Sequence, residues 1–342
     1  MQLTVLGAGA VGARVVRQLA STPDVAGLSV ADLDHRRADG VVSAVADVAR
    51  VRATAAGHRW WEGADVAVLA LAPGGHGRLA EELLEQGISV VAVSDDTADV
   101  SALLALDEEA RERGCTVVVG AGFAPGLTCV LAAHAASRLD RVDEVHVAKV
   151  GTGGPACARA HHRSLRGHSI DWRDGTWLRR RGGSGRELCW FPDPAGPEDC
   201  YRAAAPDALV LVPAFSGVRR VTARVAASRR DRLTAQLPML RRPHPEGKLG
   251  AVRVEVRGRR GTAQDAAVLG AIDRPAVAAG AVAAVAALAL ARGRMTRTGA
   301  GGLAELAEPV PFLADLARRG VKAAAFDRPP AAPAEPATTT TS

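Results

Sequence analysis

Lysine and aromatic residues are scarce in this chain of 342 residues. Only three lysines, Lys149, Lys248 and Lys322, stand among the 43 basic residues, and aromatic residues make up 3% of the sequence. Arginine therefore carries almost all of the positive charge, and alanine, valine and leucine must fill the core. No nucleic-acid-binding motif or interleaved aromatic residue accompanies the arginine clusters, so the net charge of +6 does not indicate a nucleic-acid partner.

Cysteines are few and are not arranged in pairs. The chain has five, an odd number, with no close Cys-x-x-Cys spacing. The N-terminal residues also have neither a basic segment nor a cleavage site of the secretory kind. These features are typical of reduced thiols, and we expect a cytoplasmic protein.

Long hydrophobic runs are limited to one stretch, residues 275–291. It carries no charge, but it is mostly alanine, contains Gly280 and is shorter than the ~20 strongly apolar residues that a membrane span needs. We therefore predict a buried, closely packed helix and no membrane association.

The first third of the chain alternates short β-branched runs with helical stretches. Apolar runs on both faces of each strand are typical of a parallel sheet that helices cover on each side. The alternation predicts a doubly wound α/β domain. The strands are predicted at Gln2–Leu6, Leu28–Ala31, Val66–Leu71, Val90–Val93 and Thr116–Val119, and helices at Ala13–Ala20, Gly77–Gln86 and Ser101–Arg113.

The regular alternation of strands and helices ends after Leu127, where strands are separated by long irregular connections. We predict an inserted α+β substrate domain with an antiparallel or mixed sheet. The predicted elements are a helix at Thr128–Arg138, strands at Glu144–Val150, Ala208–Val212, Arg219–Ala226 and Ala251–Arg257, and a last helix at Pro311–Arg319. The predicted divisions are 1–126 (Rossmann domain), 127–272 (substrate and dimerisation domain), 273–327 (helices that pack back on the Rossmann domain) and 328–342 (a Pro-rich disordered tail).

The strongest local motif is Gly7-Ala8-Gly9-Ala10-Val11-Gly12, which follows a predicted strand and opens a predicted helix. In that context Gly7 permits a tight turn, Gly9 lets the backbone approach a pyrophosphate, and Gly12 lets the helix pack on its strand. The free N–H groups and the dipole of the helix favour the negative charge. The motif predicts a dinucleotide site that includes Gly7, Gly9, Ala10, Val11 and Gly12.

An acidic residue follows at the spacing that such sites require. Asp32 lies 20 positions after Gly12 at the end of the next strand. Its carboxylate is expected to accept hydrogen bonds from the adenosine ribose, which favours NAD. Arg36 and Arg37 follow, and they could instead hold the 2′-phosphate of NADP. The cofactor is therefore predicted to be NAD or NADP, with NAD slightly favoured.

Two further turns are expected to border the same crevice, because ligands bind at the carboxyl ends of parallel strands. The first contains Ala72, Pro73 and Gly74, which we predict to contact the cofactor. The second contains Asp95 and Asp96. For both residues, active-site duty and capping of the following helix remain equal alternatives, and Asp96 is the predicted catalytic residue of the two.

The chain resembles the saccharopine dehydrogenase-like family over residues 1 to 325. The resemblance is carried by the glycine motif, by Ala72-Pro73-Gly74, and by the run from Asp107 to Val117 that leads into Gly120–Leu127. The strand at Arg253–Gly258 and the helix at Pro311–Val321 also match the family's pattern. Ala124, however, stands where saccharopine reductases commonly have Asp, and the tyrosine-containing stretch is missing.

The resemblance implies NAD(P)-linked hydride exchange at a C–N bond of an amino-acid-derived substrate, in amino-acid metabolism. The small-molecule substrate would lie in a cleft between the domains, and the family suggests a homodimer. Phe123, in the crossing between the domains, is expected to contact the cofactor. The departures from the family's pattern mean that saccharopine itself is not implied as the substrate.

Hydride transfer also needs a group that exchanges a proton with the substrate nitrogen. Lys149, at the end of a predicted strand, is one candidate, and an exposed strand charge is its alternative. His161 is another; surface exposure, a structural role or zinc binding with Cys157 are its alternatives. Too few ligands accompany that pair for a zinc site, so no metal is predicted. Arg163, Arg166, Arg219 and Arg220 are candidates for binding substrate carboxylates.

Three other functions remain open on the sequence alone. A non-catalytic NAD(P)-binding or redox-sensing protein would have the same cofactor motif. A dehydrogenase acting on carbonyls rather than imines would differ only in its substrate. A nucleic-acid binder is the least favoured of the three.

Overall fold

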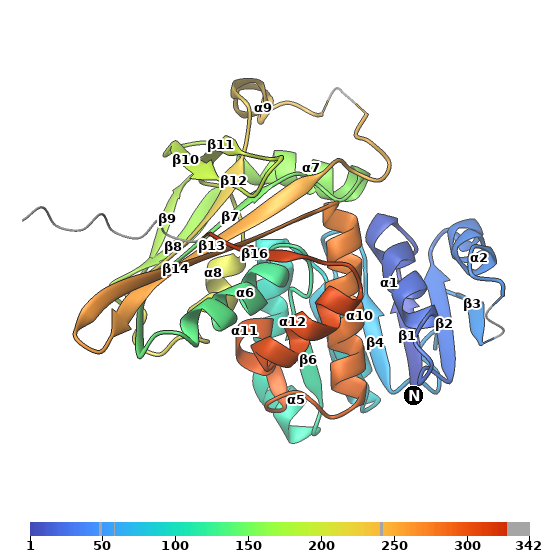
Figure 1. The fold of residues 1–342 in the computed structure, drawn as a ribbon. Coiled ribbons are helices and arrows are strands. Elements are labelled where there is room, and N and C mark those ends of the chain that lie inside the picture. Colours follow the sequence, from blue (N-terminus) through green and yellow to red (C-terminus); the bar gives the residue numbers. More distant parts are fainter. Residues whose placement is uncertain (48–49, 58, 240–241, 327–342) are drawn as a thin grey trace, which may run out of the picture.

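The computed structural model describes residues 1–326 apart from 48–49, 58 and 240–241. The predicted tail at 328–342 lies outside the described residues. Two sheets organise the chain, and Figure 1 shows the first at the lower right and the second at the upper left. The long helix α10 (Pro275–Ala291) lies against the first sheet, beside α1 (Ala10–Ala20).

The first sheet has seven strands in the order β15-β6-β5-β4-β1-β2-β3, and all of its pairings are parallel. This is the Rossmann order that the alternating pattern predicts, extended at one edge. Its strands are β1 (Gln2–Leu6), β2 (Gly27–Asp32), β3 (Val51–Ala55), β4 (Val66–Leu69), β5 (Ser89–Ala92), β6 (Thr116–Val119) and β15 (Gly299–Gly301). The flanking helices are α1 (Ala10–Ala20), α2 (His35–Ser43), α3 (His76–Glu85), α4 (Thr97–Leu104) and α5 (Asp107–Glu112).

The second sheet is mixed and has the order β10-β11-β12-β7-β13-β14-β16, with β8 pairing to β12 and β9. Only β7 and β12 run parallel; the other pairings are antiparallel. The strands are β7 (Arg141–Val150), β8 (His168–Arg173), β9 (Thr176–Arg181), β10 (Glu187–Trp190), β11 (Pro197–Tyr201), β12 (Arg220–Ala226), β13 (Gly250–Arg260), β14 (Ala263–Asp273) and β16 (Ala323–Ala325). The helices of this part are α6 (Leu127–Ala136), α7 (Pro155–Ser164), α8 (Asp207–Leu211) and α9 (Arg229–Thr234).

The end of the chain returns to both sheets. Helix α10 packs on α1 and on strands β4 and β5, while α12 (Pro309–Arg318) packs on α6 and α10. The short α11 (Leu303–Leu306) also packs on α6. Strands β15 and β16 then complete one edge of each sheet. The α/β class with a parallel Rossmann sheet and a second, mixed sheet is confirmed.

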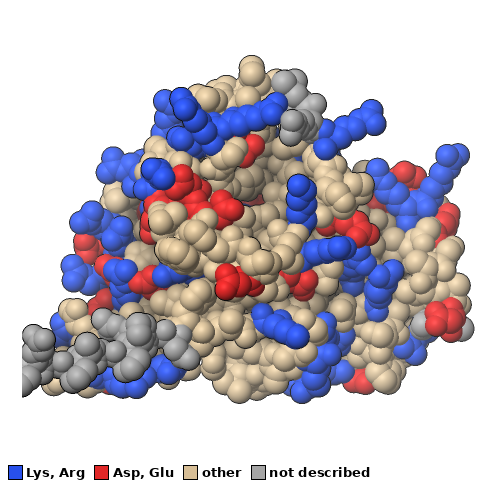
Figure 2. Space-filling view, turned by 45° about the horizontal axis from the view of Figure 1, so that its top comes forward, with Lys and Arg blue, Asp and Glu red and all other residues tan. Residues whose placement is uncertain are grey.

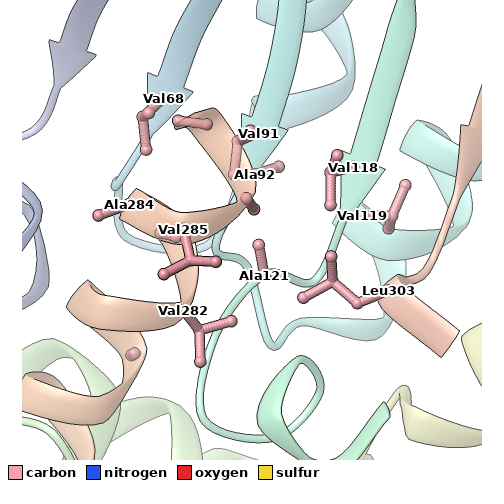
Figure 3. Close-up of a cluster of buried hydrophobic side chains, with 14 of the residues drawn as sticks. Val68, Val91, Ala92, Val118, Val119, Ala121, Val282, Ala284, Val285 and Leu303 are labelled. Atoms are coloured by element: carbon pink, nitrogen blue, oxygen red, sulfur yellow. The ribbon is translucent and has the colours of Figure 1, made fainter. Parts of the chain in front are cut away.

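The core where α10 meets the first sheet is built almost entirely from valine, alanine and leucine. In Figure 3, Val282 and Val285 of α10 point toward side chains of β4, β5 and β6, and Leu303 of α11 closes the cluster. Thirteen of the seventeen residues of α10 are buried. The buried, closely packed helix predicted from its composition is therefore confirmed. No helix among the described residues is long and apolar enough to cross a membrane.

Two predicted elements were wrong in detail. The strand predicted at Ala208–Val212 is the helix α8, which is buried against α6 and β12. A short apolar run fits a buried strand and a buried helix equally well, so periodicity could not separate them. The single helix predicted at Ser101–Arg113 is divided between α4 and α5, and Asp107 at the start of α5 accepts the backbone N–H of Ala300 in β15 at 2.8 Å.

The arginines do not form one basic surface on the face that Figure 2 shows. Lysine and arginine side chains are interspersed there with aspartate and glutamate over most of the surface. Many of them are paired, as in the contact between Arg219 and Asp174 at 3.0 Å.

Candidate functional site

The turn after β1 brings the chain back sharply into helix α1. Gly7 has a φ of +105°, a left-handed conformation, and a Cβ there would overlap the carbonyl oxygen of Ala70. A Cβ at Gly12 would overlap the carbonyl oxygen of Gly7. Both positions therefore require glycine for steric reasons, as the motif predicts.

Gly9 differs from its two neighbours because it faces open space. A Cβ built there meets no atom within 4 Å, and the residue has ordinary backbone angles. Gly9 is the N-cap of α1, where no side chain caps the helix and its first turn holds no acidic residue among those described. The N–H groups at the start of α1 therefore remain available to an anion in front of Gly9.

Asp32, at the end of β2, is fixed against the same turn. Its Oδ2 accepts the N–H of Ala8 at 2.7 Å, and its Oδ1 accepts the N–H of Asp34 at 2.9 Å. The cavity described below is lined by Asp32 and by Arg37, whose Nε lies 3.4 Å from Asp34. Arg36, the predicted alternative contact, is not among the residues that line it.

A cavity of about 710 Å³ extends from the glycine turn to the second sheet. Both parts of the chain contribute to its wall. From the first part come the glycine turn, Arg14, Arg17, Asp32, Leu33, Arg37, Ala70–Pro73, Val93–Asp95 and 122–125. From the second part come Lys149, 151–157, Arg159–His161, Pro245, Glu246, Pro275, Ala276 and Ala279. The structure thus brings together most of the predicted site residues, including Gly7, Gly9, Ala10, Val11, Ala72, Pro73 and Phe123.

Besides Arg36, three predicted site residues are not part of the cavity wall: Asp96, Gly74 and Gly12. Asp96 is the N-cap of α4, and its Oδ1 accepts the N–H groups of Ala98 at 2.9 Å and Asp99 at 3.3 Å. Of its two alternatives, capping is therefore what its side chain does. Its neighbour Asp95 faces the cavity instead. Gly74 is also outside the wall, as is Gly12, which packs against Gly7.

The buried carboxylate of Asp99 ties two cavity turns together. Its Oδ2 accepts the backbone N–H of Gly74 at 2.8 Å and the hydroxyl of Ser94 at 2.9 Å, and it lies 2.9 Å from Nδ1 of the buried His76. Burial opposes ionisation of Asp99, but these partners outweigh it and lower its pKa to about 2. Asp99 thus fixes the turn after β4 to the turn after β5.

Lys149 lies at the inner end of the cavity, near the end of β7. Its Nζ donates to Oδ2 of Asp95 at 3.3 Å and to the carbonyl oxygen of Ala124 at 3.2 Å. Burial opposes the ammonium form, but the charges of Asp95 and Asp207 outweigh it and raise the pKa of Lys149 above its usual value. Lys149 is therefore a largely buried, protonated group rather than an exposed strand charge.

His161 and Cys157 are among the side chains that helix α7 supplies to the cavity wall. Burial, with Lys149 nearby, lowers the pKa of His161 to about 4, so its imidazole is neutral at physiological pH. Nδ1 of His161 is buried and has no hydrogen-bond partner among the described residues. Burial, together with Asp95, raises the pKa of Cys157 to about 11, so this residue remains a thiol.

His162, the neighbour of His161, turns away from the cavity, and its Nε2 lies 3.0 Å from the carbonyl oxygen of Leu237. Within the described part of the chain, no three His, Cys, Asp or Glu side chains gather in a way that could hold a metal ion. The four arginines considered for carboxylate binding, Arg163, Arg166, Arg219 and Arg220, do not line the cavity.

The sequence placed both Asp95 and Asp96 at the crevice, and the helix-start pattern of Asp96-Thr97-Ala98-Asp99 could have identified Asp96 as the cap. Two arginines are among the residues of the cavity wall that were not predicted from the sequence. Arg14 and Arg17, on the exposed side of α1, follow the glycine motif at helical spacing. Asp207 directly precedes the strand predicted at Ala208–Val212; it lies outside this cavity, and it was not predicted as a site residue.

Three solved structures show the same fold at low sequence identity. Saccharopine dehydrogenase (L-Glu forming) from Saccharomyces cerevisiae has a TM-score of 0.70 and 13% identity, covering 95% of this chain and 100% of that one. An amine dehydrogenase from Mycobacterium smegmatis gives 0.54 and 12%, with 90% and 96% covered. The DAP dehydrogenase of C. glutamicum in complex with DAP gives 0.51 and 16%, with 94% and 99% covered.

No family model matches the chain. The likeness to the three structures is a likeness of fold, and it extends over both sheets and nearly the full length of the chain. The fold expected from the resemblance to the saccharopine dehydrogenase-like family is therefore confirmed.

Proposed function

We propose that this protein is an NAD(P)-dependent oxidoreductase that acts at a C–N bond of an amino-acid-derived substrate. The observation that carries the proposal is that one cavity joins an anion-accepting glycine turn to a partly buried Lys149–Asp95 pair. A nicotinamide cofactor and a small polar substrate would both find their complementary groups there. The solved structures of similar fold, which include an amine dehydrogenase and a DAP dehydrogenase, support the same class of reaction.

The residues of this chain fit the cofactor. The space in front of Gly9 and the free N–H groups of α1 would hold the diphosphate. Asp32 would accept hydrogen bonds from the adenosine ribose, and its negative charge disfavours a 2′-phosphate, so NAD is the preferred form. Ala72, Pro73 and Phe123 would contact the remaining half of the cofactor. When bound, the nicotinamide supplies or accepts the hydride.

The inner residues would handle the substrate. The ammonium of Lys149, with two of its hydrogens directed at Asp95 and Ala124, has its third hydrogen to donate to a substrate nitrogen or carboxylate. His161, neutral at physiological pH, would accept a proton from a substrate amine. Of the two aspartates considered for the active site, Asp95 rather than Asp96 would take that role. The expected homodimer and cytoplasmic location stay predictions.

Fluorescence titration with NADH and with NADPH tests the cofactor assignment, and Gly9→Val is the decisive variant. Its side chain has room in the free protein but fills the space needed by the diphosphate, so we expect a normal fold and a loss of binding of at least about tenfold. Gly40→Ala is the control, because a Cβ at Gly40 also meets no atom within 4 Å, but Gly40 is exposed on helix α2 and does not line the cavity.

The proposal fails if the wild-type protein binds neither cofactor, or if Gly9→Val binds as tightly as Gly40→Ala. Turnover with a panel of amines, imines and carbonyl compounds then separates the possible reactions. Cofactor binding without turnover on any of them would instead favour a non-catalytic binding protein. Oxidation of alcohols alone would favour a dehydrogenase acting on carbonyls.

A further inference from the structure

Lys149 separates the main cavity from a second, smaller hollow inside the protein. Together with Ala124 it lines both spaces, one on each side. The inner hollow is too small to admit a water molecule. The other residues around it are Thr128, Val147, Ala148, Ala205, Asp207, Arg224 and Val225.

Asp207 is the acidic residue of this inner hollow. It belongs to helix α8, is only 2% exposed, and accepts a hydrogen bond from the hydroxyl of the fully buried Thr128 at 2.9 Å. Because the hollow that both residues line has no room for a water molecule, the charges of Asp207 and Lys149 act on each other with little screening. A buried carboxylate in such a place is costly unless a cation compensates it.

The groups that face Lys149 come from three elements. Asp95 approaches from the turn after β5, Asp207 from α8, and Cys157 with His161 from α7. Cys157 remains a thiol, because its pKa is about 11, and His161 remains neutral, because its pKa is about 4. Asp95 and Asp207 are therefore the two groups that can hold the positive charge of Lys149 in place.

The groups that face Asp207 complete this set of charges. Burial raises the pKa of Asp207, and the charge of Lys149 opposes that rise. Cys129 of α6 is also close, and burial together with Asp207 raises the pKa of its thiol to about 12, so it adds no charge. Arg224 of β12 lines the same hollow, but its guanidinium is engaged by Asp171 at 3.0 Å.

We propose that Asp207 is a positioning residue that acts from behind Lys149 and keeps it protonated and directed into the cavity. Lys149 then serves as a hydrogen-bond and proton donor to the substrate and not as a base. The proposal rests on the proposed function for the role of Lys149, but the interaction of the two side chains is tested without cofactor or substrate.

The low lysine content makes the test direct. Pulses of acetic anhydride from about pH 7 to about pH 12, followed by mass spectrometry, measure the pKa of each of the three lysines in one protein. In Asp207→Asn, the amide oxygen still accepts the Thr128 hydroxyl, so the fold is preserved while the charge is removed. We expect the pKa of Lys149 to fall by about one unit or more.

Three controls accompany this measurement. Lys248 and Lys322, which are both exposed, serve as internal references in every sample. Glu108→Gln removes an equivalent charge from an exposed position on α5 and is expected to leave Lys149 unchanged. An unchanged pKa of Lys149 in Asp207→Asn, with unchanged references, would overturn the proposal.

Thermal unfolding gives a second, independent measurement. Lys149→Met leaves Asp207 buried without its cation, so the midpoint temperature is expected to fall. Adding Asp207→Asn to that variant is expected to restore part of the loss, since the uncompensated charge disappears. Strictly additive effects of the two substitutions would contradict the proposal. Both experiments use the free protein, so their results can be interpreted even if the protein binds no cofactor.

Discussion

At the scale of single residues, the three glycines of the turn after β1 have three separate roles. Gly7 is required by its left-handed backbone and Gly12 by contact with the carbonyl of Gly7, so both are constraints of the fold itself. Gly9 is under neither constraint, and its lack of a side chain matters only for what enters the cavity. The sequence motif contains all three glycines. Only the contacts of each glycine show whether it is needed for folding or for ligand binding.

Replacing Asp99 tests how the turns after β4 and β5 are held together. Because its pKa in the folded protein is about 2, below the usual 3.8, its stabilising effect is present above about pH 4 and is lost as the pH falls toward 2. We expect Asp99→Asn to lower the free energy of unfolding by about 2 kcal/mol at neutral pH. The free energy of unfolding of this variant should also depend less on pH below about pH 4.

Thermal denaturation of the wild type and Asp99→Asn at a series of pH values measures this effect. Asp39→Asn, an exposed residue next to His35, serves as the control with little effect. A difference between wild type and Asp99→Asn that stayed constant down to pH 2 would show that the charge of Asp99 is not the cause.

At the scale of elements, the contact between α10 and α1 determines where the glycine turn lies. A Cβ at Gly280 of α10 would overlap the Cβ of Arg14 in α1 and would lie 3.1 Å from its carbonyl carbon. The two helices are thus held at a separation that only glycine allows. Because the cofactor turn is the start of α1, this packing also positions the proposed diphosphate site.

Gly280→Ala and Gly40→Ala should have opposite effects on stability, although both replace glycine inside a helix. Helix propensity alone would stabilise each variant by up to about 1 kcal/mol. At Gly40 the space is open, so we expect that gain. At Gly280 the overlap with α1 should reverse it and destabilise the protein by about 1–3 kcal/mol. Chemical denaturation of the two variants is the measurement, and stabilisation of both would refute the close contact.

At the scale of the whole molecule, the two sheets meet around one cavity that neither could form alone. The first sheet contributes the glycine turn and Asp95, and the second contributes Lys149 and, through α7, His161. Strand β15 and helix α10 come from the end of the chain, yet they complete the first sheet and its core. The chain therefore passes more than once between the two parts that form the cavity wall.

Cofactor binding should stabilise the protein as a whole for this reason. At a concentration of NADH about 100 times its Kd, the free energy of unfolding is expected to increase by about 2.7 kcal/mol. Differential scanning calorimetry with and without NADH would detect the higher midpoint, and Gly9→Val should not respond. A midpoint that NADH leaves unchanged at that excess would argue against binding to the folded protein.

The sequence by itself determined the local features. The glycine motif, the alternation of strands and helices, the spacing to Asp32 and the alanine-rich composition of residues 275–291 each depend on residues that are close in the chain. They were enough to predict the Rossmann sheet, the mixed second sheet and the buried helix. Local signals failed where two conformations bury a short apolar run equally well, as at α8.

Only the tertiary structure decided which side chains meet. Asp95 and Asp96 are neighbours with the same chemistry, and the start of α4 turns one into a cap and leaves the other facing Lys149. Asp207 and Thr128 come from elements that are distant in sequence and line the same hollow as Lys149. Burial and charge then set the pKa of Lys149 and of His161. These quantities depend on what surrounds a group in space, which the order of residues along the chain does not record.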